Sequence, residues 1–320
     1  MIPRVATSAI DRLTRQFPAV ALTGPRQSGK TTLARALFPD RPFVSLEDLD
    51  ERELATSDPR GFLARFPDGA VLDEVQRAPD LFSYLQRRLD EAKHLGRFVL
   101  TGSQQFGLLS GITQTLAGRV GLLTLLPFSL AELQAADRGP PSLEDLLFAG
   151  LYPPIHDRGI DPPLWHEAYV RTYVERDVRQ LLEVRDLGTF QRFVRMCAAR
   201  TGQLLNLSGL AGDCGISHNT ARAWISVLEA SYLVHQLQPH HRNFEKRLVK
   251  TPKLYFWDPG LAAWLLGIES AAAVRPDLIS TGTRLSPRSI RRSISRPLRS
   301  RQKERLGRRA RCSRPLSSSW

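Results

Sequence analysis

The chain has 320 residues, of which 42% are hydrophobic and 24% charged, and its formal net charge is +13 at pH 7. This length is enough for two domains with separate cores, and no apolar run is long enough to cross a bilayer. The three cysteines, Cys197, Cys214 and Cys312, fit neither a disulfide framework nor a zinc-ligand spacing, and the N-terminus lacks the pattern of a secretory signal. We therefore expect a cytoplasmic, thiol-reduced protein without a membrane partner or a structural metal.

The first part of the chain contains a phosphate-binding loop pattern. Residues 24–31 read Gly-Pro-Arg-Gln-Ser-Gly-Lys-Thr and match Gly-x-x-x-x-Gly-Lys-Ser/Thr, the Walker A pattern, between an apolar strand and a helical stretch. The two glycines let backbone N–H groups face phosphate oxygens without Cβ clashes. Lys30 supplies a charge for the β- and γ-phosphates, and the Thr31 hydroxyl can ligate Mg²⁺. We expect ATP to bind to Gly24, Pro25, Arg26, Gln27, Ser28, Gly29, Lys30, Thr31 and Thr32.

Two adjacent carboxylates follow a later apolar strand. The stretch 70–72 ends in Asp73 and Glu74, in the manner of a Walker B segment, 43 residues after Lys30. Asp73 would hold Mg²⁺ together with Thr31, and Glu74 would polarise the attacking water. The pair turns a phosphate cradle into a predicted hydrolase site in which Glu74 and Lys30 are catalytic.

Two further catalytic candidates come from the following stretches. The strand 97–101 runs into Ser103 and Gln104, and either residue, or less favourably Thr101, would sense the γ-phosphate. The alternative is that this polar residue caps the next helix. Arg119 is a candidate arginine finger in cis or in trans, and a finger in trans requires a homo-oligomer. The alternative for Arg119 is an ordinary surface arginine.

The apolar stretches of the first part alternate with helical patterns such as 82–89. Such alternation predicts a mostly parallel α/β sheet with helices on both faces, as in P-loop NTPases of the AAA/ASCE type. The expected strands are 19–23, 43–46, 70–72, 97–101 and 122–125. Proline-rich stretches then mark a boundary region. The expected divisions are an ATPase domain (1–135), a linker or lid (136–164), a helical and winged-helix module (165–278) and a tail (279–320).

The second module is predicted to be mainly helical. One long helix is expected over 165–182 and another over 190–199, and residues 207–233 have helix-turn-helix spacing with the turn at Gly215. The stretches 233–237 and 248–256 resemble the strands of a wing. Cations in this region could contact phosphates of DNA. They are Arg222, Arg242, Lys246, Arg247, Lys250 and Lys253. The alternative is a winged-helix fold used for packing or for contact with a protein.

The positive charge is concentrated in the last segment. Residues 281–320 contain 13 lysines and arginines and one acid, Glu304, which is a net +12, so subtracting 12 from 13 leaves about +1 for the first 280 residues. This segment is rich in arginine and serine and has Trp320 as its only aromatic residue. It cannot bury a core, and we expect it to be disordered or weakly helical.

Taken together, these stretches resemble prokaryotic AAA-type P-loop ATPases fused to the module called domain of unknown function 4143. The resemblance covers about residues 1–278 and is carried by runs 22–32, 72–76, 100–103, 116–119, 173–178 and 250–256. It implies an ATPase core with a lid, then a winged helix, then a domain similar to the restriction-type nuclease fold. No Asp and Glu-x-Lys constellation follows Leu278, so no nuclease site is expected. We interpret the segment from about residue 281 as a truncated or frame-shifted terminus.

Three functions fit these features. The first is an ATPase that couples MgATP hydrolysis to movement of a DNA-contacting winged-helix module. The second is a regulatory switch gated by nucleotide, with slow turnover. The third is a nucleic-acid-binding protein that acts through its basic wing or its tail.

Overall fold

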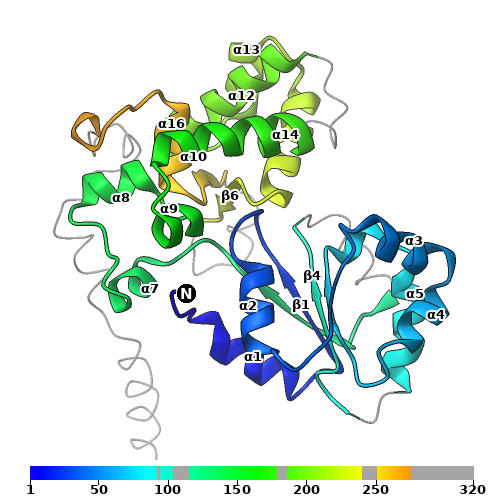
Figure 1. The fold of residues 1–320 in the computed structure, drawn as a ribbon. Coiled ribbons are helices and arrows are strands. Elements are labelled where there is room, and N and C mark those ends of the chain that lie inside the picture. The colour runs from blue at the N-terminus through cyan, green and yellow to red at the C-terminus, as the bar shows by residue number, and fades with distance from the viewer. Residues whose placement is uncertain (92–93, 104–114, 179–185, 240–250, 275–320) are drawn as a thin grey trace, which may run out of the picture.

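The structure is a computed structural model, and it describes residues 1–91, 94–103, 115–178, 186–239 and 251–274. The first part forms an α/β unit and the second a mainly helical unit (Figure 1). The predicted tail (279–320) and its interpretation as an aberrant terminus lie outside the described residues. The predicted domain limits stay a prediction.

The first part is built on a parallel sheet with the strand order β2-β3-β4-β1-β5. Its strands are β1 (Ala19–Thr23), β2 (Phe43–Ser45), β3 (Val71–Asp73), β4 (Phe98–Thr101) and β5 (Val120–Thr124). The predicted α/β class is confirmed, although β5 begins two residues before the predicted 122. Strand β4 lies between β1, which leads into the phosphate-binding loop, and β3, which ends in Asp73. The end of β4 therefore lies next to both the loop and the acidic strand β3.

Helices cover both faces of this sheet because successive strand residues point to opposite sides. Val20 and Leu22 of β1 pack with α1 (Ala6–Thr14) and α2 (Lys30–Leu37). Ala19 and Ala21 belong to the opposite core, which includes α3 (Leu49–Ser57), α4 (Pro59–Ala64) and α5 (Leu81–Asp90). All five residues of β1 are buried, as a central parallel strand requires.

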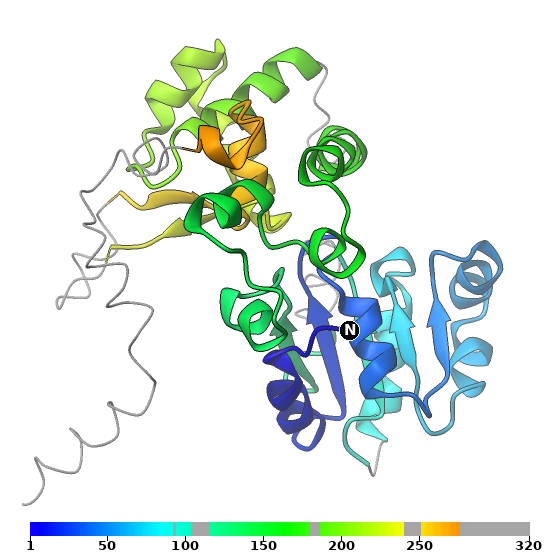
Figure 2. The ribbon, with the colours of Figure 1, turned by 60° about the vertical axis from the view of Figure 1, so that its left-hand side comes forward.

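Short helices connect the sheet to the second part. They are α7 (Leu130–Ala135), α8 (Leu143–Ala149), α9 (Pro153–Arg158) and α10 (Pro162–Tyr169). The predicted long helix over 165–182 is not a single α-helix, because α10 passes into a π-helix, η2 (Val170–Val178), and residues 179–182 lie outside the described part. Figure 2 shows this second part beside the edge of the sheet at which the P-loop lies.

The rest of the second part shares one hydrophobic core. It contains α12 (Leu187–Ala199), α13 (Leu207–Cys214), α14 (His218–Ala230), β6 (Val234–Leu237), β7 (Lys253–Phe256), α16 (Pro259–Leu265) and η3 (Ala271–Ala273). Gly215 ends α13 in a left-handed conformation with φ 68°, and Ser217 caps α14 through its side chain. Strands β6 and β7 are antiparallel. The winged-helix assignment stays a prediction, since the segment between these strands is described only in part.

Within the described ranges, no helix is both long enough and apolar enough to cross a membrane.

Candidate nucleotide-binding site

The P-loop connects the end of β1 to the start of α2 in a conformation that explains its glycines. Gly24 has φ 139°, and a Cβ there would lie 2.1 Å from the carbonyl oxygen of Leu125. Gly29 has φ 91° at the N-cap of α2. Both positions need glycine, one for space beside the neighbouring strand and both for the positive φ. The loop therefore presents the N-terminus of α2 to the site, where an anion is favoured.

Lys30 is the buried cation of this loop. Its side chain donates hydrogen bonds from Nζ to the carbonyl oxygens of Gly24, at 3.0 Å, and Pro25, at 2.8 Å. Burial lowers the pKa of Lys30 to about 8, and the nearby Glu74 and Asp73 oppose that shift in part. A desolvated ammonium beside a helix N-terminus fits a phosphate group, which would restore the missing counter-charge.

Asp73 and Thr31 come together as the sequence predicts. Asp73 ends β3 and is buried, and its Oδ1 accepts a hydrogen bond from Thr31 Oγ1 at 2.9 Å and another from Thr101 Oγ1. Burial raises the pKa of Asp73, and the two hydroxyl donors oppose this shift. A carboxylate and a hydroxyl oxygen are the hard ligands that Mg²⁺ takes in such sites, so these residues fit the metal.

Glu74 is held by two side chains, one of which the sequence did not single out. Its Oε2 accepts hydrogen bonds from Ser103 Oγ, at 3.0 Å, and from Gln76 Nε2. Its backbone has φ 53° and begins a 3₁₀ turn, η1 (Val75–Arg77), which returns Gln76 to the carboxylate. Ser103 therefore contacts Glu74, and its role as a γ-phosphate sensor stays a prediction. Gln104, the other sensor candidate, lies outside the described residues.

The structure places Arg119 away from the P-loop. Arg119 directly precedes β5, and its carbonyl oxygen accepts from the N–H of Ala19 at the beginning of β1. The P-loop follows the other end of β1, so Arg119 lies at the opposite edge of the sheet. Its guanidinium forms two hydrogen bonds with Asp90, at 2.5 and 3.0 Å. A finger in trans, acting on another copy, stays a prediction.

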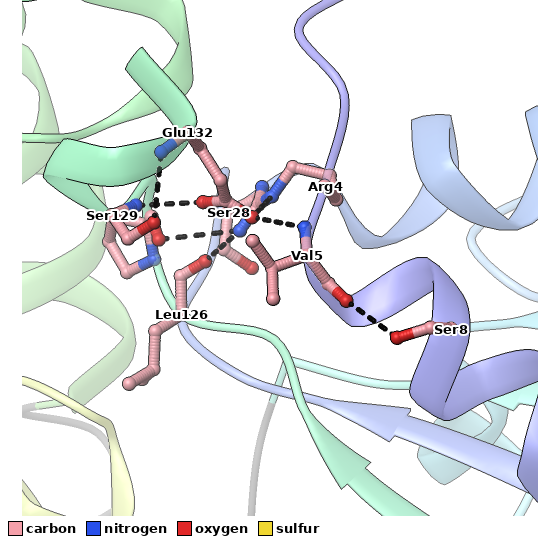
Figure 3. Close-up of polar contacts among 8 residues, drawn as sticks. Arg4, Val5, Ser8, Ser28, Leu126, Ser129 and Glu132 are labelled. Carbon is pink, nitrogen blue, oxygen red and sulfur yellow. Dashed lines mark hydrogen bonds and ion pairs between the residues drawn. The ribbon is translucent and has the colours of Figure 1, made fainter. Parts of the chain in front are cut away.

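A buried ion pair contacts the P-loop, and the sequence did not single it out (Figure 3). Arg4 donates from Nε to Glu132 Oε1 at 3.2 Å and from Nη1 to the carbonyl oxygen of Ser28 at 2.9 Å. Glu132 also accepts from the N–H groups of Val5 and Ser129, both at 2.7 Å. Burial lowers the pKa of Arg4, and Glu132 opposes this shift. The sequence signal that could have identified Glu132 is the capping box that it forms with Ser129 at the start of α7.

A cavity of 440 Å³ lies between the P-loop and the second part. Its size is in the range of small-ligand sites. The P-loop side and the acidic strand contribute Gln27, Lys30, Thr31, Asp73 and Glu74. The opposite side contributes Phe128, Pro153, Arg158, Tyr169 and Tyr173. Most of the predicted phosphate-binding residues, both predicted metal ligands and Glu74 thus line one cavity, and the second part supplies a wall of it.

The predicted DNA-contacting cations are only partly described. Arg222 is exposed on α14, and Lys253 is half-buried at the start of β7. Arg242, Lys246, Arg247 and Lys250 lie outside the described residues. DNA contact therefore stays a prediction.

Comparisons with known proteins agree with the fold of the first part. Residues 16–134 match the family model described as AAA domain, and residues 140–272 match the one described as Domain of unknown function (DUF8612). The latter is a different family from domain of unknown function 4143, so the predicted fusion to that module is not supported.

Two curated relatives are the Uncharacterized protein Rv2008c of Mycobacterium tuberculosis and the Uncharacterized protein Mb2031c of Mycobacterium bovis. Each is 34% identical over 276 residues, which cover 85% of this chain and 61% of the relative. The chain thus spans about three fifths of the length of these relatives.

Among solved structures, the Walker-type ATPase PABY2304 of Pyrococcus abyssi is similar with a TM-score of 0.52 and 17% identity, over 83% of this chain and 96% of that one. At this identity the likeness concerns the fold. The chain therefore has the fold of a P-loop ATPase with an AAA-type domain, followed by a part similar to a domain of unknown function.

Proposed function

We propose that this protein binds and hydrolyses MgATP in the cavity beside the P-loop. The observation that carries the proposal is the convergence of Lys30, Thr31, Asp73 and Glu74 on one cavity at the carboxyl ends of β1 and β3. Lys30 supplies a cation for the phosphates, Thr31 and Asp73 supply two oxygen ligands for the metal, and Glu74 supplies a base.

The binding residues have separate tasks. The P-loop N–H groups and the Lys30 ammonium hold the β- and γ-phosphates. The hydrogen bond between Thr31 and Asp73 already aligns the two oxygens that would hold Mg²⁺ directly or through water. When bound, Mg²⁺ offsets the negative charge on the phosphates.

Glu74 is the proposed general base. Its Oε2 is occupied by the donors Gln76 and Ser103, and the described residues place no hydrogen bond on Oε1. Oε1 can therefore accept a proton from the attacking water. The two donors fix the plane of the carboxylate, and this fixes the direction in which Oε1 points.

The decisive experiment measures ATP binding and turnover for the wild type, Lys30→Ala and Glu74→Gln. We expect Glu74→Gln to retain ATP but to lose hydrolysis by roughly a hundredfold or more, since a general base contributes about 10²–10⁴. Lys30→Ala should lose binding. Arg87→Ala, which removes an exposed pair with Glu91, is the matched control. Unchanged nucleotide binding in Lys30→Ala would remove the assignment.

We further propose that nucleotide occupancy is coupled to the position of the second part, because Tyr169 and Tyr173 contribute to the wall of the cavity. The competing function is a switch with slow turnover. Single-turnover hydrolysis separates the two. The switch is favoured if ATP stays bound and is hydrolysed far more slowly than the binding partner of the protein dissociates.

DNA is the proposed partner of the second part, on the basis of exposed Arg222 on α14 and of the basic residues of the predicted wing. A salt titration of DNA binding, repeated after deletion of 281–320, separates binding by the wing from binding by the tail. A salt slope that the deletion leaves unchanged excludes the tail. Absence of DNA binding in both chains contradicts the proposal.

A further inference from the structure

A side chain of the second part holds the P-loop directly. Trp165, on α10, donates a hydrogen bond from Nε1 to Oε1 of Gln27 at 2.9 Å. The two residues are 138 positions apart in the sequence. Gln27 is the third residue after the first glycine of the P-loop, so this bond joins the phosphate-binding loop to the second hydrophobic core.

The P-loop needs an external support at this point. Gln27 has φ 60°, a left-handed conformation that residues other than glycine seldom adopt and that persists only where the surroundings hold it. The next residue is held from the other side, since the Ser28 carbonyl oxygen accepts from Arg4 Nη1. The loop is thus fixed at two successive residues, by the N-terminal segment and by the second part.

Trp165 is a rigid donor. It is buried and stacks on Tyr169, with ring centroids 4.7 Å apart and an interplanar angle of 20°. It also lies 4.4 Å from the ring of Tyr152. The hydroxyl of Tyr152 donates to that of Tyr169 at 3.0 Å, so the two flanking rings are fixed to each other. The direction of the indole N–H is therefore set by the packing of the second core.

The same aromatic group reaches the end of α14. The rings of Tyr169 and Tyr173 lie 5.2 Å apart, and the Tyr173 hydroxyl donates to the carbonyl oxygen of Ser231 at 3.1 Å. Ser231 is the C-cap of α14. Contiguous contacts therefore run from Gln27 through Trp165, Tyr169 and Tyr173 to that helix.

We propose that Trp165 is a positioning residue for the P-loop: its bond to Gln27 keeps the loop in the conformation that receives phosphate, so that the second part controls nucleotide affinity. This inference rests on the proposed function, which supplies the identity of the ligand. Trp165 acts through Gln27 and is not among the described residues that line the cavity, so it has no direct part in hydrolysis.

The test is a double-mutant cycle on ATP affinity in the full chain. Trp165→Phe keeps a buried ring and removes the N–H donor, and Gln27→Met removes the acceptor. Each single variant should bind ATP about fivefold more weakly, the net effect of one hydrogen bond, and the double variant should be no weaker than either. Trp264→Phe, at a partly buried tryptophan beside the same core, is the control and should bind as the wild type does.

A second readout distinguishes positioning from general stabilisation. Subtracting the tryptophan emission of Trp165→Phe from that of the wild type gives the contribution of Trp165. This contribution should change when ATP is added, because the indole reports the state of the loop. Equal ATP affinity in Trp165→Phe and wild type, or additive losses in the double variant, would overturn the inference. A wild-type chain that does not bind ATP would instead refute the proposed function. Should Trp165→Phe unfold, Gln27→Met still tests the bond, and wild-type affinity in that variant counts against it.

Discussion

Arg4 and Glu132 form a buried ion pair beside the P-loop, with side chains that are each 6% exposed and with 3.2 Å between Nε and Oε1. The pair brings together three distant parts of the chain: the N-terminal segment, the Ser28 carbonyl of the P-loop and the start of α7. Because both side chains are buried, water has little access to either charge if its partner is removed. The pair therefore carries consequences both for stability and for the site.

The first prediction concerns this pair. Arg4→Met leaves Glu132 buried without its cation, and we expect the free energy of unfolding to fall by about 3–5 kcal/mol. Urea denaturation measures the change. Arg15→Ala, which breaks an exposed pair with Asp11, is the matched control and should cost less than about 1 kcal/mol. Equal losses in the two variants would contradict the structural role of the buried pair.

The second prediction concerns the protonation of Lys30. Burial holds its pKa at about 8 in the free protein, below its ordinary value of 10.5. An anion beside the ammonium favours the charged form and raises that pKa. ATP binding should therefore take up a proton above about pH 8, and affinity should fall as the pH rises through that value.

Calorimetry at pH 8.5 in buffers of different ionisation enthalpy checks this uptake. Lys30→Arg is the matched variant, since its guanidinium keeps the charge throughout this range. That variant should bind ATP without taking up a proton at this position. Proton uptake equal to that of the wild type would assign the effect to another group.

The same shift has a consequence for stability in the absence of nucleotide. The unfolded lysine binds its proton up to a higher pH than the folded one, so the Lys30 contribution favours folding increasingly as the pH rises from about 8 to 10.5. Below this window both states are protonated, and the buried charge is a cost.

The third prediction concerns Gln76. Its amide donates to Glu74 Oε2, and its loss leaves Ser103 as the side-chain donor described on that oxygen. Gln76→Ala should lower kcat by about tenfold with little change in KM, because the base is less well oriented while the phosphate contacts remain. Steady-state kinetics measures this. Gln86→Ala on α5 serves as the control, and a raised KM with unchanged kcat would argue against a positioning role.

The fourth prediction follows from the place of Arg119. Because it lies at the opposite edge of the sheet and pairs with Asp90, Arg119→Ala should leave ATP affinity unchanged. A role in trans makes a separate prediction. Mixing Arg119→Ala with Lys30→Ala should then restore turnover, since the second variant supplies an intact Arg119 to the intact P-loop of the first. Failure of the mixture to exceed the sum of the separate activities would exclude the finger.

Sequence reasoning names candidate site residues most directly where the chemistry is local. The phosphate loop is a continuous run, and Asp73 and Glu74 are adjacent, so their types and spacing identify them. The alternation of strands and helices also predicted the sheet, and parallel strands bring the ends of β1 and β3 to one edge. The contact between Thr31 and Asp73 follows from that topology, although its distance does not.

The supporting residues could not be predicted in the same way. Arg4 and Glu132 are separated by 128 positions, and Gln27 and Trp165 by 138, and no local pattern records such pairings. The two interpretations of Arg119 could not be separated, because a motif next to a strand does not say at which end of the sheet it lies. The π-helical turn after Tyr169 was not predicted, because the pattern of apolar residues over a few positions does not distinguish an α-helix, with 3.6 residues per turn, from a wider helix.

The backbone conformation of Glu74 determines which residues fit this position at low cost. Its left-handed conformation, with φ 53°, is one that glycine or asparagine adopts at lower cost. A substitution to either residue would relieve local strain and would also remove the carboxylate. Glutamate at this position therefore costs local conformational stability, and the proposed role of its carboxylate as the general base accounts for that cost.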